Sequence, residues 1–147
     1  VLQDVSYGAD WSLAAWVQST GPSDNEALIV GRVGCNGGLY TQGGFYQFAI
    51  KTSNANCWSG AAGLNGLAVD SNWRHLAGVY QGGVMRFYVD GRLVNSGFIA
   101  QIYGYSTTLR IGGTGSRVFN GKIDDVRIYS RAMTPGEILY IYRGGAY

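Results

Sequence analysis

Hydrophobic and polar residues alternate along most of this chain with the two-residue period of half-buried β-strands. The clearest case is Phe45–Lys51, where Tyr46, Phe48 and Ile50 face one side and the intervening residues face the other. Comparable patterns predict strands at 11–18, 26–33, 57–62, 73–80, 84–89, 107–112 and 121–130, with loops at 34–44 and 113–117. The chain is therefore predicted to be all-β.

Residues 73–95 predict three consecutive strands joined by two tight turns. Residues 81–83 include two glycines, which tolerate positive φ. Asp90-Gly91 is typical of a type I′ turn, in which both central residues need positive φ. A meander of this kind indicates an antiparallel sheet, which usually supports a binding surface.

One helix is expected, close to the C-terminus. Thr134-Pro135-Gly136-Glu137 matches a capping box with proline in the first turn, and apolar residues follow at 138, 139, 141 and 142. Many short strands and one small helix predict a single domain over residues 1–147. Its expected architecture is a two-sheet antiparallel jelly-roll sandwich with a short C-terminal helix.

The composition argues against several classes of protein. The chain has 147 residues, 46% of them hydrophobic and 14% charged, which suits a folded domain and excludes disorder. The formal net charge is +2 and the basic residues form no cluster, so nucleic-acid binding is not expected. No apolar run reaches the ~20 residues that a membrane-spanning helix requires, so membrane insertion is not expected either.

Two cysteines, Cys35 and Cys57, flank a segment rich in glycine and tyrosine. Two thiols do not make a four-ligand zinc site. A disulfide closing this loop would contribute ~3 kcal/mol in the chain-entropy model. We expect the bridge, and with it a secreted or cell-surface location.

Four segments resemble one known family. They are SLAAWV at 12–17, the meander at 73–94, LRIGG at 109–113 and FNGKIDDVRIYSRAMTPGEI at 119–138. Together they are similar to the laminin-G-like domains of the concanavalin A-like lectin/glucanase superfamily. The resemblance implies two curved antiparallel sheets, an extracellular setting and a carbohydrate-binding or adhesive role. It also implies a calcium ion at one rim, as in many members.

The chain departs from that family at its start. The family opens with an additional strand carrying an acidic F-D-G-x-D-D-Y type segment, whereas here Val1–Asp10 contains only isolated Asp4 and Asp10. A sheet edge left uncovered in this way is a template for strand addition from another chain. The second interpretation is therefore a homo-oligomer or filament, as a self-assembling structural subunit of an extracellular fibre or surface layer.

Asp124 is the main candidate for the calcium site. It shares its predicted strand face with Val126 and Ile128, so we expect it to point inward, where a carboxylate needs a partner. The resemblance implies a calcium ion here, with Asp4 or Asp10 completing the oxygen shell. The alternative is a hydrogen bond from backbone amides. Asp125 is expected to contact Arg127 on the same face of the strand.

Catalysis is not expected. Glucanases of the resembling family carry an E-x-D-x-x-E set on one strand, whereas Glu26 and Glu137 stand alone here. The adjacent pair Asp124-Asp125 points to opposite faces of a strand, so it does not supply an acid and a base across one bond. The single histidine, His75, lies within a predicted strand and is interpreted as structural.

Sugar binding needs exposed aromatic faces beside amides, arginines or carboxylates. Two segments have this mixture, and their candidate residues for binding a glycan or glycoprotein are Tyr40, Gln42, Tyr46, Asn54, Asn56 and Trp58, and Tyr103, Tyr105, Arg117 and Asn120. Trp58 is the strongest single candidate, the alternative being local packing against the disulfide. The tryptophans at 11, 16 and 73 lie in regular strands and are expected in the core.

Overall fold

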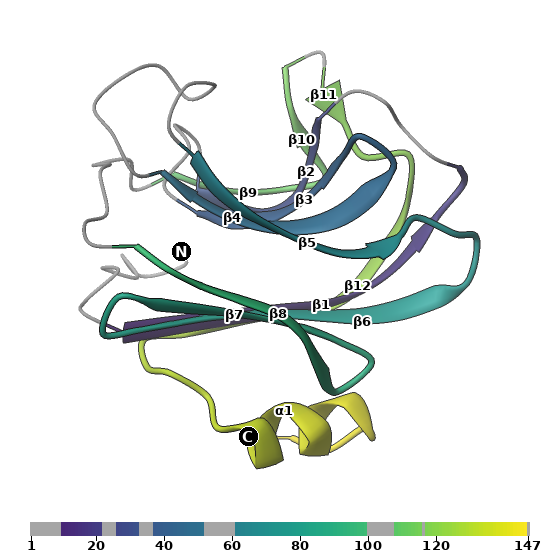
Figure 1. The fold of residues 1–147 in the computed structure, drawn as a ribbon. Helices are drawn as coiled ribbons and strands as arrows, with labels where there is room; N and C mark the ends of the chain where they lie inside the picture. The colour runs from purple at the N-terminus through teal and green to yellow at the C-terminus, as the bar shows by residue number, and fades with distance from the viewer. Residues whose placement is uncertain are drawn as a thin grey trace.

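The computed structural model describes residues 10–21, 26–32, 37–51, 61–99, 108–115 and 117–146, and within them two sheets face each other (Figure 1). Sheet A has the strand order β12-β1-β6-β7-β8, and sheet B the order β10-β11-β2-β3-β4-β5, with β9 also paired to β2. The pairings are antiparallel except that between β11 and β2. The predicted jelly-roll sandwich is confirmed.

The elements have the following bounds: β1 (Asp10–Ser19), β2 (Ala27–Arg32), β3 (Gly38–Gln42), β4 (Phe45–Lys51), β5 (Ala61–Ala68), β6 (Trp73–Gln81), β7 (Val84–Val89), β8 (Arg92–Phe98), β9 (Leu109–Ile111), β10 (Gly113–Thr114), β11 (Arg117–Val118), β12 (Gly121–Tyr129) and α1 (Pro135–Tyr142). Strand β4 has the bounds that the alternation predicts. In the described part of the chain, no helix has the length and hydrophobicity required to span a membrane.

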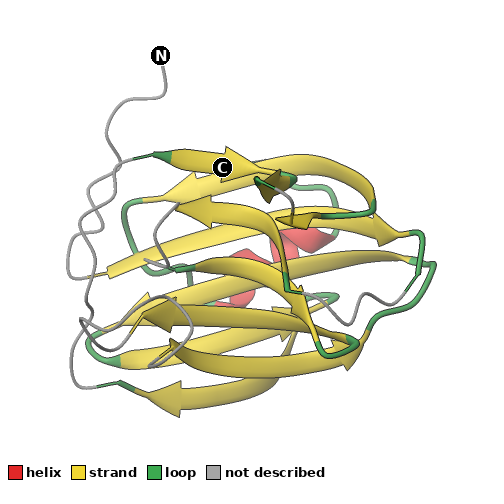
Figure 2. Cartoon of the chain, turned by 90° about the horizontal axis from the view of Figure 1, so that it is seen from above, coloured by secondary structure: helices red, strands yellow, loops and turns green. Residues whose placement is uncertain are grey.

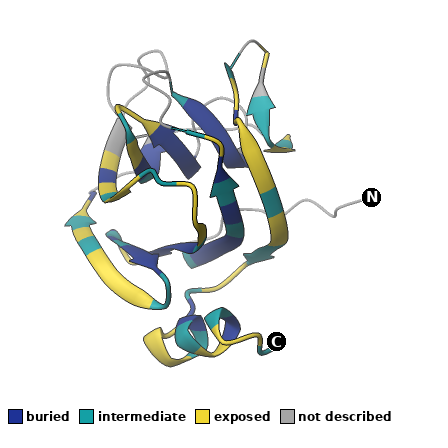
Figure 3. Cartoon of the chain, turned by 90° about the vertical axis from the view of Figure 1, so that its right-hand side faces the viewer, coloured by how far each residue is buried: buried dark blue, intermediate teal, exposed yellow. Residues whose placement is uncertain are grey.

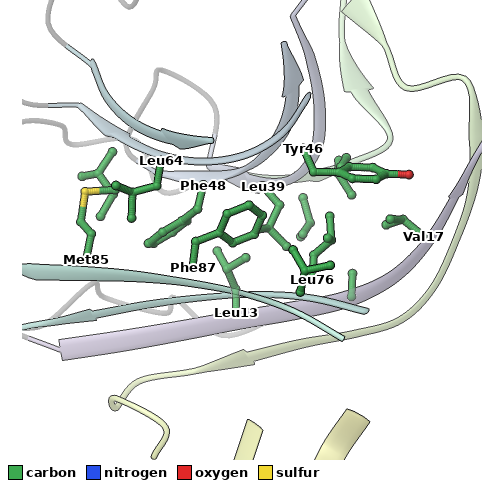
Figure 4. Close-up of a cluster of buried hydrophobic side chains, with 14 of the residues drawn as sticks. Leu13, Val17, Leu39, Tyr46, Phe48, Leu64, Leu76, Met85 and Phe87 are labelled. Carbon is green, nitrogen blue, oxygen red and sulfur yellow. The ribbon is translucent and has the colours of Figure 1, made fainter. Parts of the chain in front are cut away.

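The main core lies between the two sheets, where the inward residues of each strand interdigitate (Figure 4). Phe48 of β4 lies at the centre of an aromatic cluster, with ring centroids 5.6 Å from Trp11 and 6.4 Å from Phe87. All three side chains are fully buried. The apolar area that such core side chains remove from water is the main favourable contribution to the free energy of folding.

Both predicted turns of the meander have the backbone that their sequences require. Gly82 and Gly83 have φ of 54° and 89°, and Asp90 and Gly91 have φ of 51° and 76°. Positive φ at both central residues is the mark of a type I′ turn, whose twist matches that of the flanking strands. The turns set the register of β6, β7 and β8.

Helix α1 begins with the predicted capping box. Thr134 Oγ1 accepts a hydrogen bond from the Glu137 amide at 3.2 Å, and Glu137 Oε2 accepts one from the Thr134 amide at 2.8 Å. The buried side of the helix, with Ile138 and Ile141, packs on the outer face of sheet A. Figure 2 shows the helix behind the strands, and Figure 3 shows its buried side turned towards the sheet. The outer face of sheet A is thus covered.

Several sequence-based expectations need correction. The expected loop at 34–44 contains β3, and the expected turn after residue 62 is the interior of β5. Residues 113–114 and 117–118 form two short strands. Trp73 is 41% exposed, because it begins β6 at the end of the sheet. Trp11 is in the core as predicted, and Trp16 is half-buried under α1.

Candidate functional site

The outer face of sheet B is concave in Figure 1, since the strand ends rise away from sheet A. Tyr40 of β3 pairs with Gln47 of β4, and Gln47 pairs with Asn65 of β5. Because neighbouring strands lie ~4.8 Å apart, the three residues form a row of about 10 Å across the sheet. Residues in one such row point to the same side, away from the core.

Two amides in this row hold each other in place. Gln47 Nε2 donates a hydrogen bond of 2.9 Å to Asn65 Oδ1. Within the described residues, no hydrogen bond engages Gln47 Oε1 or Asn65 Nδ2, which leaves one acceptor and one donor for a ligand. Gly63 makes room for the pair, because a Cβ at that position would lie 2.5 Å from Gln47 Nε2. The amides are therefore oriented before any ligand arrives.

An aromatic ring lies in the adjacent row of the same face. Phe45 pairs with Gln42 on one side and Ala68 on the other, and its side chain is 40% exposed. It precedes Gln47 by two residues, so the ring and the amide pair are about 7 Å apart along β4. We call Phe45, Gln47 and Asn65 the amide-aromatic patch. The alternation of β4 predicted that Phe45 and Gln47 share one face, and the burial of Tyr46 and Phe48 shows that this face is turned away from the core.

The predicted tyrosines occupy different environments. Tyr40 lies on the outer face, but it packs against Leu28 and Ala49 and is only 8% exposed. Tyr46 points the other way and is fully buried in the core. Burial is the main cause that raises the pKa of Tyr46 to about 12. Tyr46 therefore belongs to the interior of the sandwich and offers no open ring to a ligand.

Sheet B also carries part of the second predicted group. Arg117 begins β11, and its neighbour Val118 pairs with Leu28, the residue that pairs in turn with Tyr40. The Asn120 carbonyl accepts hydrogen bonds from the Thr20 amide at 3.0 Å and Thr20 Oγ1 at 3.1 Å. The other predicted binding residues, Asn54, Asn56, Trp58, Tyr103 and Tyr105, lie outside the described residues, as do Cys35 and Cys57.

Asp124 is exposed, contrary to the expectation that it points inward. The cause is a β-bulge: Ala14 pairs with Arg127 and Trp16 with Asp124, so two residues of β12 lie opposite one of β1. Asp125 in the bulge has φ of 47°. Asp124 Oδ1 accepts a hydrogen bond of 2.8 Å from the Asp125 amide, which is the alternative role foreseen for it. In a strand without this bulge, Asp124 would share the inward face of Val126 and Ile128.

The expected contact between Asp125 and Arg127 also lies at the bulge. Asp125 and Arg127 form a two-pronged ion pair, with Arg127 Nε 2.8 Å from Oδ1 and Nη2 2.7 Å from Oδ2. The hydrogen bonds to Arg127 are the main cause that lowers the pKa of Asp125. The predicted contact between these two residues is confirmed.

The proposed calcium ligands are widely separated. Asp10 begins β1, six residues before Trp16, the partner of Asp124, so the two carboxylates lie about 20 Å apart along the strand. Asp10 Oδ1 instead accepts a hydrogen bond of 3.0 Å from the Gly82 amide. Among the residues that the structure describes, no three acidic, histidine or cysteine side chains gather as a metal site. Asp4 lies outside them.

Asp70 and Asp90 are both bound by Arg74, whose hydrogen bond is the main cause that lowers the pKa of Asp70 to about 2. Among the described acidic residues, Glu26 has a raised pKa. Burial is the main cause, and the positive charge of Arg117 opposes the rise. A glycosidase needs a second carboxyl nearby.

The two facing antiparallel sheets with one short helix have the fold of a lectin-like sandwich. A family model described as the concanavalin A-like lectin/glucanases superfamily, in its laminin-G-like branch, matches residues 2–139. The chain therefore belongs to this superfamily, as its sequence motifs predict.

Solved structures with the same fold include botulinum neurotoxin binding domains. A type C structure, described by its dependence on two ganglioside molecules for cell entry, has a TM-score of 0.72, with 15% identity over 95% of this chain and 36% of that one. Serotype DC in complex with rat synaptotagmin II gives 0.73, with 16% identity over 99% and 38%. Serotype DC in complex with SialylT gives 0.71, with 16% identity over 97% and 37%. The chain spans little more than a third of these structures, and the likeness shows the fold.

Proposed function

We propose that this chain is a non-catalytic, extracellular carbohydrate-binding or adhesion module whose ligand is a glycan or glycoprotein. The observation that carries the proposal is the amide-aromatic patch, an exposed ring beside two amides fixed by their own hydrogen bond. Membership of a superfamily of lectins and glucanases supports it. So do the ganglioside and SialylT partners named for structures with this fold.

The patch fits the chemistry of a sugar. The apolar C–H face of a pyranose stacks on Phe45, while its hydroxyls donate to Gln47 Oε1 and accept from Asn65 Nδ2. Each hydrogen bond contributes about 0.5–1.5 kcal/mol net, so one sugar residue binds weakly. Affinity then depends on further contacts along the ligand, and we propose that Trp58, the residue after Cys57, supplies a second stacking face.

A binding role is favoured over hydrolysis by the state of the carboxylates. A general acid needs a raised pKa, whereas hydrogen bonds from Arg74 hold the pKa of Asp70 far below its ordinary value. Glu26, with the raised pKa, has Arg117 as its charged neighbour and lies just before β2, whereas the patch lies on β4 and β5. Asp70 is thus ionised at neutral pH, which does not suit a general acid.

The test is glycan-array binding followed by affinity electrophoresis in gels containing the best ligand. Gln47→Ala and Asn65→Ala should each lower the affinity about tenfold or more, because each also releases its partner amide. Gln81→Ala is the matched control, since Gln81 is an exposed amide at the end of β6 in the other sheet. Wild-type affinity in both patch variants, with the fold intact, overturns this site.

A calcium ion bound by Asp124 and Asp4 is a separate proposal, and a thermal melt with and without chelator tests it. A bound ion at 100 times its dissociation constant stabilises the folded state by ~2.7 kcal/mol, so removing it should lower the Tm by several degrees. An unchanged midpoint removes the proposal. Glycan binding measured in the same two conditions shows whether the ion belongs to the sugar site.

Self-association is a second candidate function, favoured by edge strand β8. Leu93, Val94 and Phe98 of this strand are 53%, 45% and 72% exposed, and β8 ends the strand order of sheet A. Unpaired backbone and apolar side chains at an edge favour strand addition. Sedimentation velocity across a concentration series tests it: Phe98→Lys should shift an assembled species towards monomer, and a wild type that stays monomeric refutes it.

A further inference from the structure

A groove of about 580 Å³ opens where the end of the sandwich meets α1. One side comes from β5 and β8 and the other from the helix, and the residues that matter here are Leu67, Val94, Leu139, Tyr142, Arg92 and Arg143. The Asp90-Gly91 turn packs closely on the helix, since a Cβ on Gly91 would lie 3.0 Å from Leu139 and Tyr142. The volume is within the range of small-molecule sites.

The inner wall of the groove is fixed by one ion-pair network. Arg74 Nη1 donates to Asp90 Oδ2 at 2.8 Å, and its other nitrogens bind Asp70. Asp90 Oδ1 accepts from the His75 amide at 2.9 Å. Both oxygens of Asp90 are therefore occupied and its charge is compensated, so the one acidic residue lining the groove does not repel an anion strongly.

Two arginines lining the groove remain available. Arg92 follows the Asp90-Gly91 turn and Arg143 is the C-cap of α1, and both are exposed. No ion pair or side-chain hydrogen bond joins either guanidinium to another residue in the described ranges. A guanidinium presents a planar fork of donors that matches a carboxylate. The groove thus combines anion-binding groups with an apolar floor.

The groove is continuous with the amide-aromatic patch through β5. Asn65 belongs to the patch, and Leu67, two residues further along the same strand, lines the groove. The two positions are about 7 Å apart along the strand. Asn95 of β8 donates a hydrogen bond of 2.9 Å to the Asn65 carbonyl, which joins β8 of sheet A to β5 of sheet B. A ligand longer than one sugar can therefore reach both.

We propose that the groove binds an acidic sugar residue, whose carboxylate is held by Arg92 and Arg143 while its ring lies against Leu67 and Tyr142. The patch then binds a neutral part of the same glycan. This inference rests on the carbohydrate-binding function proposed above and names its ligand class as acidic glycans. Affinity falls with rising ionic strength, because both arginines are exposed to solvent.

The experiment follows the arginine Nε–Hε signals in ¹⁵N-correlated NMR spectra of the intact chain during titration with free glucuronate. Glucose is the matched neutral probe, and N-acetylglutamate is a carboxylate without a sugar ring. Glucuronate should shift the Arg92 and Arg143 signals saturably and leave Arg110, an exposed arginine on β9, unshifted. Arg92→Gln or Arg143→Gln should each weaken binding about tenfold or more, whereas Arg110→Gln should not.

Each contrary result has a defined meaning. Equal shifts with glucose, with N-acetylglutamate, or at Arg110 overturn the acidic-sugar site, as does the absence of any shift with glucuronate. Neutral-glycan binding that depends on Gln47 is measured separately. If neutral glycans bind through Gln47 but glucuronate causes no shift, only the groove is refuted. If glucuronate binds but neutral-glycan binding does not depend on Gln47, only the patch is refuted. Spectra of the glutamine variants that retain the wild-type dispersion show that the fold is intact.

Discussion

His75, the single histidine of the chain, is buried between sheet A and α1 and should make stability depend on pH. Its ring centroid lies 5.3 Å from that of Trp16 and 5.9 Å from that of Tyr142, and its side chain is almost without exposed surface. Burial is the main cause that lowers the pKa of His75 to about 4. Asp90 and Asp125 oppose this shift, and Arg127 reinforces it.

The sign follows from comparing the folded and unfolded states. The unfolded chain binds a proton at His75 with a pKa near 6.5, while the folded chain does so only near 4. The full stability is therefore present above about pH 6.5 and is lost as the pH falls towards 4. Between about pH 7.5 and pH 5 the free energy of unfolding should fall by about 2 kcal/mol from this group.

The assay is urea unfolding at these two pH values for the wild type and for His75→Phe. The phenylalanine variant lacks the titrating group, so its change with pH should be about 2 kcal/mol smaller than that of the wild type. The comparison cancels the contributions of Asp70, Asp125 and Glu26, which both proteins share. An equal pH dependence in the two proteins would refute the reasoning, as would an NMR titration of His75 with a midpoint near 6.5.

Three further changes test the core, the patch and the helix cap. Phe87→Ala should lower the free energy of unfolding by about 3–5 kcal/mol in urea titrations, since it empties the centre of the core; a loss under about 1 kcal/mol contradicts that placement. Gly63→Ala should displace the Gln47 amide and weaken glycan binding several-fold with little change in Tm, and unchanged affinity would show that the space is not needed. Thr134→Ala should cost about 1 kcal/mol of stability, whereas no loss in thermal melts would mean that the cap is redundant.

The architecture could be predicted because its signals are local. The alternation of apolar residues determines which side chains of β4 share a face. Asp90-Gly91 favours the positive φ of a hairpin turn, and the spacing of Thr134 and Glu137 marks the first turn of the helix. Each signal depends on the geometry of a few adjacent residues. None of them requires knowledge of which strands pair.

The site was less predictable because it depends on pairing between strands. Asn65 lies opposite Gln47 only through the register of β4 and β5, and that register contains a bulge between Phe45 and Gln47. The same difficulty applies to Asp124, which a bulge in β12 turns outward. The groove unites Arg92 and Arg143, which are far apart in sequence, through the docking of α1. Sequence alternation contains no information about such long-range placement.

The outer faces of the two sheets have different roles. Helix α1 covers the outer face of sheet A with a second apolar cluster, which contains Ala77, Val79 and Tyr88 from the sheet and Ile138 and Ile141 from the helix. The outer face of sheet B carries the patch instead. His75 lies under the helix, on the covered sheet, so its protonation should weaken the helix contact without moving Gln47 or Asn65. The affinity of the folded protein for a neutral glycan bound by the patch should therefore remain constant over the pH range in which stability falls. A parallel loss of both would show that the two faces are coupled through the core.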